Sequence, residues 1–366
     1  MDKNLKYLNA INVLAAGKIG ALQAVHNAFG GDWERAWSAN LAKYIPQDRD
    51  ANGKLVLSDF QRLKKAVDPD REWTKLEKEK IRIITILDED YPKLLTHIHT
   101  PPFLLYIRGS SDVLHGLCFG IVGTRALSEY GRRSTPHLVL DIARAGFTIV
   151  SGLAAGIDTL AHKSALEAGA KTIAVLGTGI DDRTIFPALN LGLAHKIIEN
   201  GGAVISEYAA GTHGTKFTFP QRNRIVSGLS KGVLVVEADE RSGALITAAY
   251  ALEQNRDVFA VPGGIFTKTS RGPNNLIKKG AKPVTCAEDV LEEYDIRVPH
   301  PESRIPVRGD NPEEERILAI LTGEPMTTDD IIRRSELDAS LVAATLTVME
   351  LNKKIKITGN KYVPAS

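Results

Sequence analysis

The sequence predicts an α/β protein with an extended Rossmann-like, doubly wound and mainly parallel sheet, a small helical domain before it and a winged-helix domain after it. Three observations support this prediction. Short apolar runs bounded by glycine recur between residues 117 and 261, as expected of parallel strands that are buried on both faces. Each run ends in a loop of small or polar residues. A stretch rich in proline and charge, residues 297–312, then separates a last helical segment from the rest.

The composition is that of a soluble globular protein with two or three domains. The chain has 366 residues, of which 25% are charged and 43% hydrophobic, and its net charge of +2 excludes a histone-like polycation. Cys118 and Cys286 are the two cysteines, so we expect no disulfide framework and a cytoplasmic location. The first residues lack the apolar segment of a signal peptide and no apolar run is long enough to span a membrane, so we expect no membrane association.

Residues 1–70 are predicted to form the small helical domain. Apolar residues at three- and four-residue spacings run from about residue 4 to 41, and Gly17-Lys18-Ile19-Gly20 interrupts them. A Gly-x-Ile-Gly hairpin between short helices can present N–H groups to a DNA backbone, and a glycine-rich corner without that role is the alternative. A loop is predicted at residues 51–53, followed by a second helical stretch at 58–80.

Residues 71–296 are predicted to form the sheet. A strand at 81–86 and a proline-containing connector at 100–106, leading into another strand, precede the main series. If the main strands are parallel, the loops that follow them meet along one edge of the sheet, which is where open α/β sheets bind ligands. The main strands are predicted at 117–122, 147–150, 172–176, 203–206, 232–237 and 258–261.

Two strand-to-helix turns at this edge predict an anion site. The first is Gly123-Thr124-Arg125, and the second runs from Ser151-Gly152 to Gly156 and Asp158. Small residues let backbone N–H groups at a helix start approach a phosphate closely, and the helix dipole favours its negative charge. Arg125 adds a planar, permanently charged guanidinium. Ser242-Gly243, at another predicted helix start, has the same capacity.

The segment at 216–230 indicates which anion binds. It interleaves Phe217 and Phe219 with Lys216, Arg222 and Arg224. Single-stranded DNA binding requires this combination, because cations follow the phosphates while aromatic rings stack on the bases. A buried aromatic anchor among surface charges would explain either phenylalanine singly, but it does not explain the whole segment.

No pattern in the sequence supports catalysis or metal binding. There is no Gly-x-x-x-x-Gly-Lys-Ser/Thr loop, and the nine histidines are scattered without the spacing of zinc ligands. Asp158 and His162 are four residues apart and could share a helix face near Ser151. Such a pair at a helix start is more often structural. We therefore expect no catalytic residue, metal or cofactor.

Residues 313–366 are predicted to form a winged-helix domain. Helical patterns at 313–321, 327–332 and 340–351 precede a hairpin that turns at Gly359-Asn360. The third helix presents Ser340, Ala343, Ala344 and Thr347 and has no arginine. Protein contact or a scaffolding role is therefore at least as consistent with this helix as base reading.

The chain resembles a known family, the bacterial DNA-processing protein A (DprA/Smf) proteins. The resemblance is dense from about residue 90 to 293, and its motifs follow one another in a fixed order. The helical N-terminus resembles the SAM-like domain of this family, and the C-terminal segment resembles the winged helix that many members carry. The matching motifs are at 121–125, 130–131, 151–158, 161–162, 219–230, 242–243, 260–263 and 272–277.

The resemblance implies a dimeric, non-enzymatic protein that binds and protects incoming single-stranded DNA. It also implies that the protein helps to load the RecA recombinase in natural transformation and DNA recombination. By position, Arg125 would hold a phosphate, and Lys216, Phe219 and Arg222 would line the DNA path. The other residues expected at the DNA are Gly123, Thr124, Ser151, Gly152, Gly156, Asn223, Arg224, Ser242 and Gly243, and those expected at the dimer interface are Leu245, Ile246, Ala249 and Leu252.

Two departures from the family pattern bear on affinity. Many members have Tyr-Pro followed by basic residues where this chain has Phe186-Pro187-Ala188-Leu189-Asn190, and Arg183 is a candidate substitute. Many members also have a larger polar or basic residue at the position of Ala155.

The alternative function is that of a Rossmann-like nucleotide-binding enzyme of the nucleoside monophosphate phosphoribohydrolase type. Such enzymes carry a Pro-Gly-Gly-x-Gly-Thr-x-x-Glu motif. The segment at 262–267 begins in the same way but lacks the later glycine and the catalytic glutamate.

Overall fold

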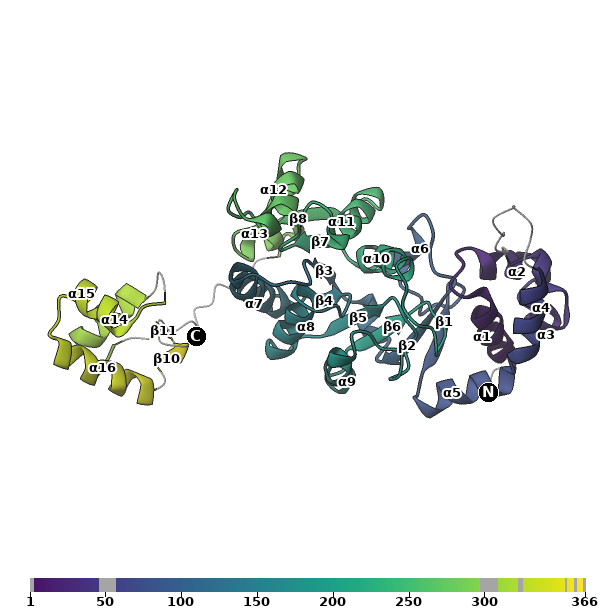
Figure 1. The fold of residues 1–366 in the computed structure, drawn as a ribbon, viewed down its shortest axis with the longest axis horizontal. Coiled ribbons are helices and arrows are strands. Elements are labelled where there is room, and N and C mark those ends of the chain that lie inside the picture. The colour runs from purple at the N-terminus through teal and green to yellow at the C-terminus, as the bar shows by residue number, and fades with distance from the viewer. Residues whose placement is uncertain are drawn as a thin grey trace. The chain divides into compact units, whose positions relative to one another are not determined.

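The computed structural model describes residues 3–45, 57–296, 309–321, 325–352, 354–358 and 361–364. The predicted loop at 51–53, most of the predicted linker at 297–312 and the predicted turn at Gly359-Asn360 lie outside these ranges. The chain divides into two compact units, Met1–Ile296 and Arg297–Ser366 (Figure 1).

A nine-stranded sheet in the order β1-β2-β6-β5-β4-β3-β7-β8-β9 forms the centre of the first unit. The strands from β3 to β9 are mutually parallel, whereas β2 pairs antiparallel with both β1 and β6. This arrangement confirms the predicted mainly parallel, doubly wound sheet. The strands are β1 (Arg82–Thr85), β2 (Leu104–Gly109), β3 (Cys118–Val122), β4 (Thr148–Ser151), β5 (Thr172–Leu176), β6 (Ala203–Ser206), β7 (Gly232–Val235), β8 (Asp257–Ala260) and β9 (Lys282–Pro283).

The strands are apolar throughout because both faces of the sheet are covered. Successive side chains of a strand point to opposite faces, and β5 shows the result. Ile173 and Val175 belong to one buried apolar cluster, and Ala174 and Leu176 belong to another. A strand that is buried on both faces does not show the alternation of polar and apolar residues that is typical of a half-exposed strand.

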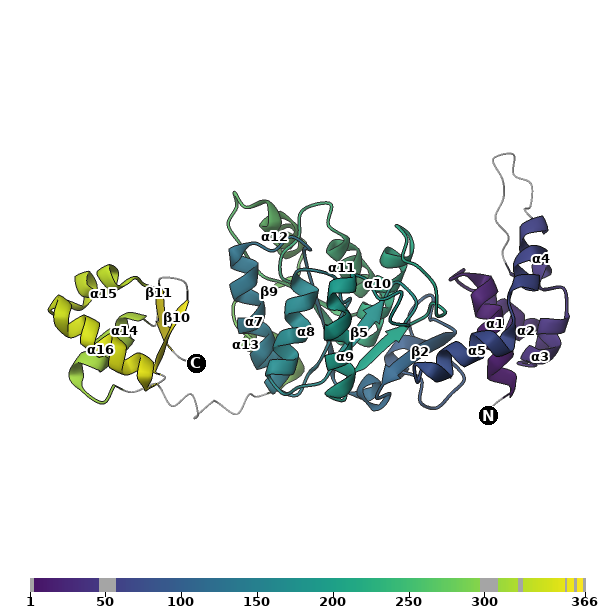
Figure 2. The ribbon, with the colours of Figure 1, turned by 60° about the horizontal axis from the view of Figure 1, so that its bottom comes forward.

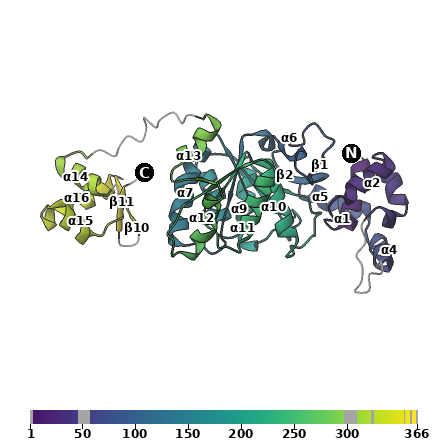
Figure 3. The ribbon, with the colours of Figure 1, turned by 90° about the horizontal axis from the view of Figure 1, so that it is seen from above.

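Helices cover the two faces of the sheet. Helices α7, α8 and α9 lie in front of the sheet in Figure 2, and α10, α11 and α12 lie in front of it in Figure 3. The helices that follow the N-terminal segment are α6 (Lys93–Thr96), α7 (Glu129–Arg144), α8 (Ile157–Glu167), α9 (Leu191–Glu199), α10 (Thr218–Leu229), α11 (Gly243–Glu253), α12 (Arg271–Lys278) and α13 (Glu288–Leu291). Short 3-10 helices are η1 (Leu41–Lys43), η2 (Asp112–His115), η3 (Ala188–Asn190), η4 (Lys268–Ser270) and η5 (Glu292–Tyr294).

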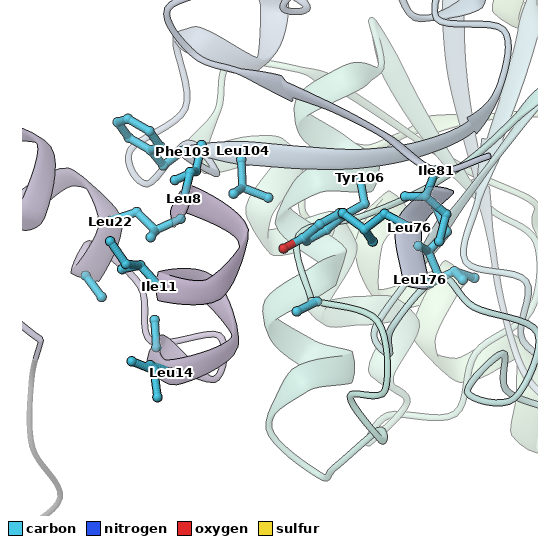
Figure 4. Close-up of a cluster of buried hydrophobic side chains, with 14 of the residues drawn as sticks. Leu8, Ile11, Leu14, Leu22, Leu76, Ile81, Phe103, Leu104, Tyr106 and Leu176 are labelled. Carbon is cyan, nitrogen blue, oxygen red and sulfur yellow. The ribbon is translucent and has the colours of Figure 1, made fainter. Parts of the chain in front are cut away.

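The N-terminal helices share an apolar core with the sheet. Leu8, Ile11 and Leu76 lie in the same buried cluster as Leu104 and Leu176 (Figure 4). The predicted boundary between residues 70 and 71 falls inside α5, which packs on α1. The helices are α1 (Lys3–Ala15), α2 (Ala21–Phe29), α3 (Trp33–Ser38), α4 (Leu57–Ala66) and α5 (Pro69–Lys78).

The glycine corner between α1 and α2 fits closely against the sheet domain. Gly17 has a φ of 75°, and a Cβ atom there would lie 2.3 Å from Cε1 of Tyr208. A larger residue would therefore push the corner away from the loop that follows β6. The corner thus has a structural role.

The second unit is a winged-helix domain, as predicted. Ile317, Ile331, Leu346 and Met349 lie in its apolar core. Strands β10 and β11 pair antiparallel, and Met326 forms a bridge with Tyr362 of β11. The elements are α14 (Pro312–Leu321), α15 (Thr328–Ser335), α16 (Ala339–Leu351), β10 (Ile355–Thr358) and β11 (Lys361–Pro364).

Candidate functional site

A pocket of about 360 Å³ opens beyond the carboxyl ends of β3 and β4. In the sheet, β3 lies between β4 and β7, so the strand order reverses at β3. Crevices at this reversal point are the usual ligand sites of open α/β sheets. The lining residues are Val122, Gly123, Arg125, Gly152, Ala154, Asp158, Lys216, Phe219, Pro220, Arg222, Asn223, Val226, Ser242, Gly243, Ala244 and Thr247.

The turn after β3 presents Arg125 to the pocket. The Thr124 N–H donates to the Glu237 carbonyl at 2.7 Å, and the Thr124 carbonyl accepts from the Ile157 N–H at 3.1 Å. These bonds tie the turn to the neighbouring loops. The Arg125 guanidinium is exposed and lies 5.6 Å from the centre of the Phe219 ring. Among the described residues no carboxylate forms an ion pair with it, so its charge is available to an anion.

Arg222 holds the loop after β4 from its buried side. This side chain is 4% exposed, and its Nη1 donates to the carbonyl of Gly152 at 2.6 Å and to that of Val175. A Cβ atom on Gly152 would lie 2.5 Å from Nη2 of Arg222, so the loop requires glycine there. Burial lowers the pKa of Arg222 to about 10. The guanidinium therefore remains charged at neutral pH and adds a positive charge to the floor of the pocket, which the Asp158 carboxylate also lines.

Asp158 organises the same loop at the start of α8. Its carboxylate accepts the N–H groups of Gly152 at 3.1 Å and Ala154 at 3.3 Å. Burial raises the pKa of Asp158, and the charge of Arg222 opposes this shift. His162 is also buried, donates to or accepts from Thr172 Oγ1 at 2.7 Å, and has its pKa lowered to about 3 by burial. The hydrogen bonds of Asp158 and His162 therefore stabilise the fold around the loop after β4.

Aromatic rings form one side of the pocket. Phe219, in the first turn of α10, and Phe186, in the loop after β5, have ring centres 5.7 Å apart. Phe186 is 52% exposed, and both rings line a small side pocket together with Arg125 and Arg222. Lys216 is exposed just before α10, with Nζ 5.1 Å from the Phe217 ring. The arrangement thus places cations beside exposed aromatic faces.

The start of α11 completes the pocket. Ser242 caps this helix by accepting the N–H of Ala244 at 3.3 Å. The Asn223 amide donates to the Gly243 carbonyl at 3.2 Å and so links α10 to α11. The positive end of the α11 dipole therefore faces the pocket and favours a negatively charged ligand.

Most of the residues that the sequence predicted to contact DNA come together here. The four exceptions are placed differently. Arg224 is 3% exposed and pairs with Glu207 at 2.6 Å, and Ser151 donates from Oγ to the Ile121 carbonyl at 2.6 Å. Thr124 turns its hydroxyl to Ala126, and Gly156 packs on the turn after β3, where a Cβ atom would lie 2.2 Å from the Thr124 carbonyl oxygen.

Sequence reasoning did not assign several of the residues that shape the pocket. The sequence places Asp158 in the turn after the strand at 147–150 but does not predict that its carboxylate holds this loop, and Phe186 enters only through a departure from the family pattern. Phe186 lies in the loop after β5, and no local pattern in the sequence indicates that it reaches the pocket. Ala154, Pro220, Val226, Ala244 and Thr247 also line the pocket.

Across the described parts of the chain, no three His, Cys, Asp or Glu side chains come together as a metal site would require. None of the described helices is long and apolar enough to cross a membrane.

A Rossmann-like fold with a positive, aromatic-edged pocket at the reversal of its strand order defines an α/β protein of the nucleotide- or nucleic-acid-binding class. A family model described as DNA recombination-mediator protein A matches residues 82–295, and one described as DprA winged helix domain matches residues 301–359. The chain belongs to this DNA recombination-mediator protein A (DprA/Smf) family. The family predicted from the sequence motifs is thereby confirmed.

Relatives from two bacteria illustrate the similarity. DNA processing protein DprA of Streptococcus pneumoniae is 46% identical over 218 residues, which cover 60% of this chain and 76% of that protein. The X-ray structure of the S. pneumoniae protein superposes with a TM-score of 0.66 at 36% identity and covers 79% of this chain and 97% of that one. A structure of the Helicobacter pylori protein, solved to study its single-stranded DNA binding mode, gives a TM-score of 0.53 at 30% identity and covers 59% and 98%.

Proposed function

We propose that this chain binds single-stranded DNA in the pocket beyond β3 and β4. The observation that carries the proposal is the pairing of uncommitted cations with aromatic rings that line the pocket. Arg125 and Lys216 line the main pocket together with Phe219, and Arg125 also lines the side pocket together with the exposed Phe186. The cations bind phosphates, and the aromatic rings stack on bases. The single-stranded DNA binding of the H. pylori relative supports the same assignment.

The pocket favours a single strand over a duplex. A base offers its face to an aromatic ring only when it is unstacked from its neighbours. Phe186 and Phe219 lie at the pocket itself, where a nucleotide held by Arg125 would meet them. The remaining polar groups, on Asn223, Ser242 and Gly243, suit phosphate and sugar contacts that carry no sequence information. Binding is therefore tolerant of sequence.

The cellular role that follows is that of a recombination mediator without enzymatic activity. In this role the protein protects incoming single-stranded DNA in the cytoplasm and helps to load the RecA recombinase during natural transformation and recombination. The description of the family as DNA recombination-mediator proteins supports this role.

The winged-helix domain is more consistent with protein contact than with base reading. Helix α16 contains no lysine or arginine. Its exposed positions include Leu341, Val348 and Leu351. A helix that reads bases in the major groove needs hydrogen-bonding side chains at such positions.

Dimerisation through α11 would place two pockets on one DNA strand. The outward face of α11 carries Ile246, Ala249 and Leu252, with Ile246 38% and Leu252 59% exposed, while Leu245 packs in part on the core. Two linked pockets bind one strand with greater avidity than either alone. Sedimentation at micromolar concentration should show a species near twice 39.8 kDa, and Leu252→Glu should shift it to the monomer. A wild-type monomer that still binds DNA would contradict this assembly.

The experiment that tests the proposed function separates binding from turnover. The full chain is incubated with labelled oligonucleotides and, separately, with nucleoside monophosphates. We expect a mobility shift with single-stranded oligonucleotides and no release of free base. The loop at 262–267 supports this expectation, because Asn274 holds Gly263 through hydrogen bonds of 3.2 and 3.0 Å and the segment supplies no glutamate. Base release without a shift would instead indicate the phosphoribohydrolase type of enzyme.

A further inference from the structure

A second pocket, of about 330 Å³, lies beside the first at the carboxyl edge of the sheet. Its charged and titratable lining consists of Lys75, Lys78, Glu79, Asp181, Arg183 and His213. These residues come from the end of α5 and from the loops that follow β5 and β6. None of them belongs to the pocket described above.

The carboxylates of this second pocket are already engaged. Asp181 accepts the Gly211 N–H at 2.7 Å and the Thr184 hydroxyl at 2.6 Å. Glu79 accepts the Asp182 N–H at 3.0 Å and lies 3.2 Å from the Arg108 guanidinium. Hydrogen bonds and an ion pair thus compensate both negative charges inside the protein.

Two cations of the pocket have no such partner. Lys75 is paired with Glu72 at 2.5 Å. Lys78 and Arg183, in contrast, are exposed and form no ion pair with any residue that the structure describes. The charge that this pocket offers to a ligand is therefore that of Lys78 and Arg183, which suits a phosphate.

The two pockets draw their linings from the same two loops. In the loop after β5, Arg183 lines the second pocket, and Phe186, three residues later, lines the aromatic side of the first. In the loop after β6, His213 lines the second pocket and Lys216 lines the first. Three residues span at most about 10–11 Å, so the pockets are close neighbours.

The residues that lie between the two pockets pack against one another. Gly214 lies directly against Phe219, where a Cβ atom would come within 2.4 Å of the ring. The exposed Phe186 ring stands next to Phe219. A chain of nucleotides that leaves Arg125 therefore meets a ring and then a second pair of cations.

We propose that the second pocket is a further phosphate subsite for the same DNA strand. The inference rests on the proposed function and extends it. Bases stack on Phe219 and Phe186, and the phosphates beyond them meet Arg183 and Lys78. The DNA strand would then run from the pocket at β3 toward the end of α5. The bound segment would be longer than one pocket can hold.

The test compares short and long oligothymidylates on the full chain carrying Lys78→Ala and Arg183→Ala together. Lengths of about 4 and about 16 nucleotides bracket the usual site sizes of single-strand-binding domains. We expect the affinity for the long oligomer to fall about tenfold or more, because charged hydrogen bonds are lost. The slope of log affinity against log salt should become shallower by about 1.4, at about 0.7 for each phosphate contact. The affinity for the short oligomer should stay unchanged.

A matched control removes two exposed cations elsewhere in the first unit. Lys163 and Lys231 are exposed and form no ion pair with a described residue, so Lys163→Ala with Lys231→Ala gives the same change in net charge. Equal losses in the control would show that only bulk charge matters and would overturn the subsite. Equal losses for the short oligomer, or no loss for the long one, would also overturn it. If the unmodified chain binds neither oligomer, the proposed function itself fails and the subsite fails with it.

Discussion

Arg125 and Arg222 line the same pocket in opposite environments. Arg125 is exposed and has no carboxylate partner among the described residues, whereas Arg222 is buried and holds the carbonyls of Gly152 and Val175. An exposed cation is available to a ligand. A buried cation that binds two main-chain carbonyls supports the loop that forms the pocket. Substitutions of the two arginines should therefore separate binding from stability.

We expect Arg125→Ala to weaken single-stranded DNA binding by about 1.5–3 kcal/mol, because one charge-assisted phosphate bond is lost. Arg132→Ala is the control for the loss of one positive charge. Arg132 is exposed on α7, does not line the pocket, and is 3.7 Å from the Glu129 carboxylate. Equilibrium titration with a fluorescent oligonucleotide measures both. Equal losses for the two variants would mean that only net charge matters.

We expect Arg222→Ala to lower the free energy of unfolding of the first unit by at least about 2 kcal/mol. The reason is that two buried carbonyls lose their donor, at about 1–3 kcal/mol each. Arg125→Ala should stay within about 0.5 kcal/mol of the unmodified chain, as an exposed substitution. Urea unfolding followed by tryptophan fluorescence is selective here, because Trp33, Trp37 and Trp73 all lie in the first unit. A stable Arg222→Ala variant would refute the supporting role.

The burial of Arg222 could have been predicted from the sequence, and that of Arg224 could not. Arg222 lies three residues before Ile225 and four before Val226, so helical spacing places it on their buried face. Arg224 is buried because Glu207, in the loop after β6, pairs with it. No local pattern in the sequence indicates this ion pair, because Glu207 reaches Arg224 only when α10 packs against the loop after β6.

At the scale of elements, the apolar runs predicted the strands because the sheet is buried on both faces. The strands at 172–176 and 203–206 match residue for residue. The strand predicted at 232–237 ends at Val235, and Glu237 instead accepts hydroxyl hydrogen bonds from Ser128 at 2.5 Å and Thr269 at 2.8 Å. The role of Phe186 depends on how the loop after β5 folds over α10, which the sequence pattern does not encode.

We expect a chain that ends at Ile296 to stay folded and to bind DNA. The first unit has its own sheet and apolar clusters, and the compact units divide after this residue. Thermal unfolding followed by tryptophan fluorescence should give the same midpoint as the full chain, within the error of the measurement. Aggregation of the shortened chain, or complete loss of DNA binding, would show that the two units depend on each other.

At the scale of the whole molecule, the chain combines the proposed DNA pocket of its first unit with a winged-helix domain for which we propose protein contact. The first unit supplies cations and rings along one edge of its sheet. The second unit supplies an α16 surface without basic residues. A dimer would join two such edges on one strand and leave the winged-helix domains to meet other proteins.

The measurement that tests the central claim most directly is the salt dependence of binding to a single strand and to the matching duplex. We predict tighter binding to the single strand, with log affinity falling by about 0.7 for each phosphate contact per unit of log salt. Arg125 and Lys216 alone give a slope of about −1.4, and a subsite at Lys78 and Arg183 makes it steeper. Equal affinity for the duplex and the single strand, or no weakening as salt rises, would contradict the account.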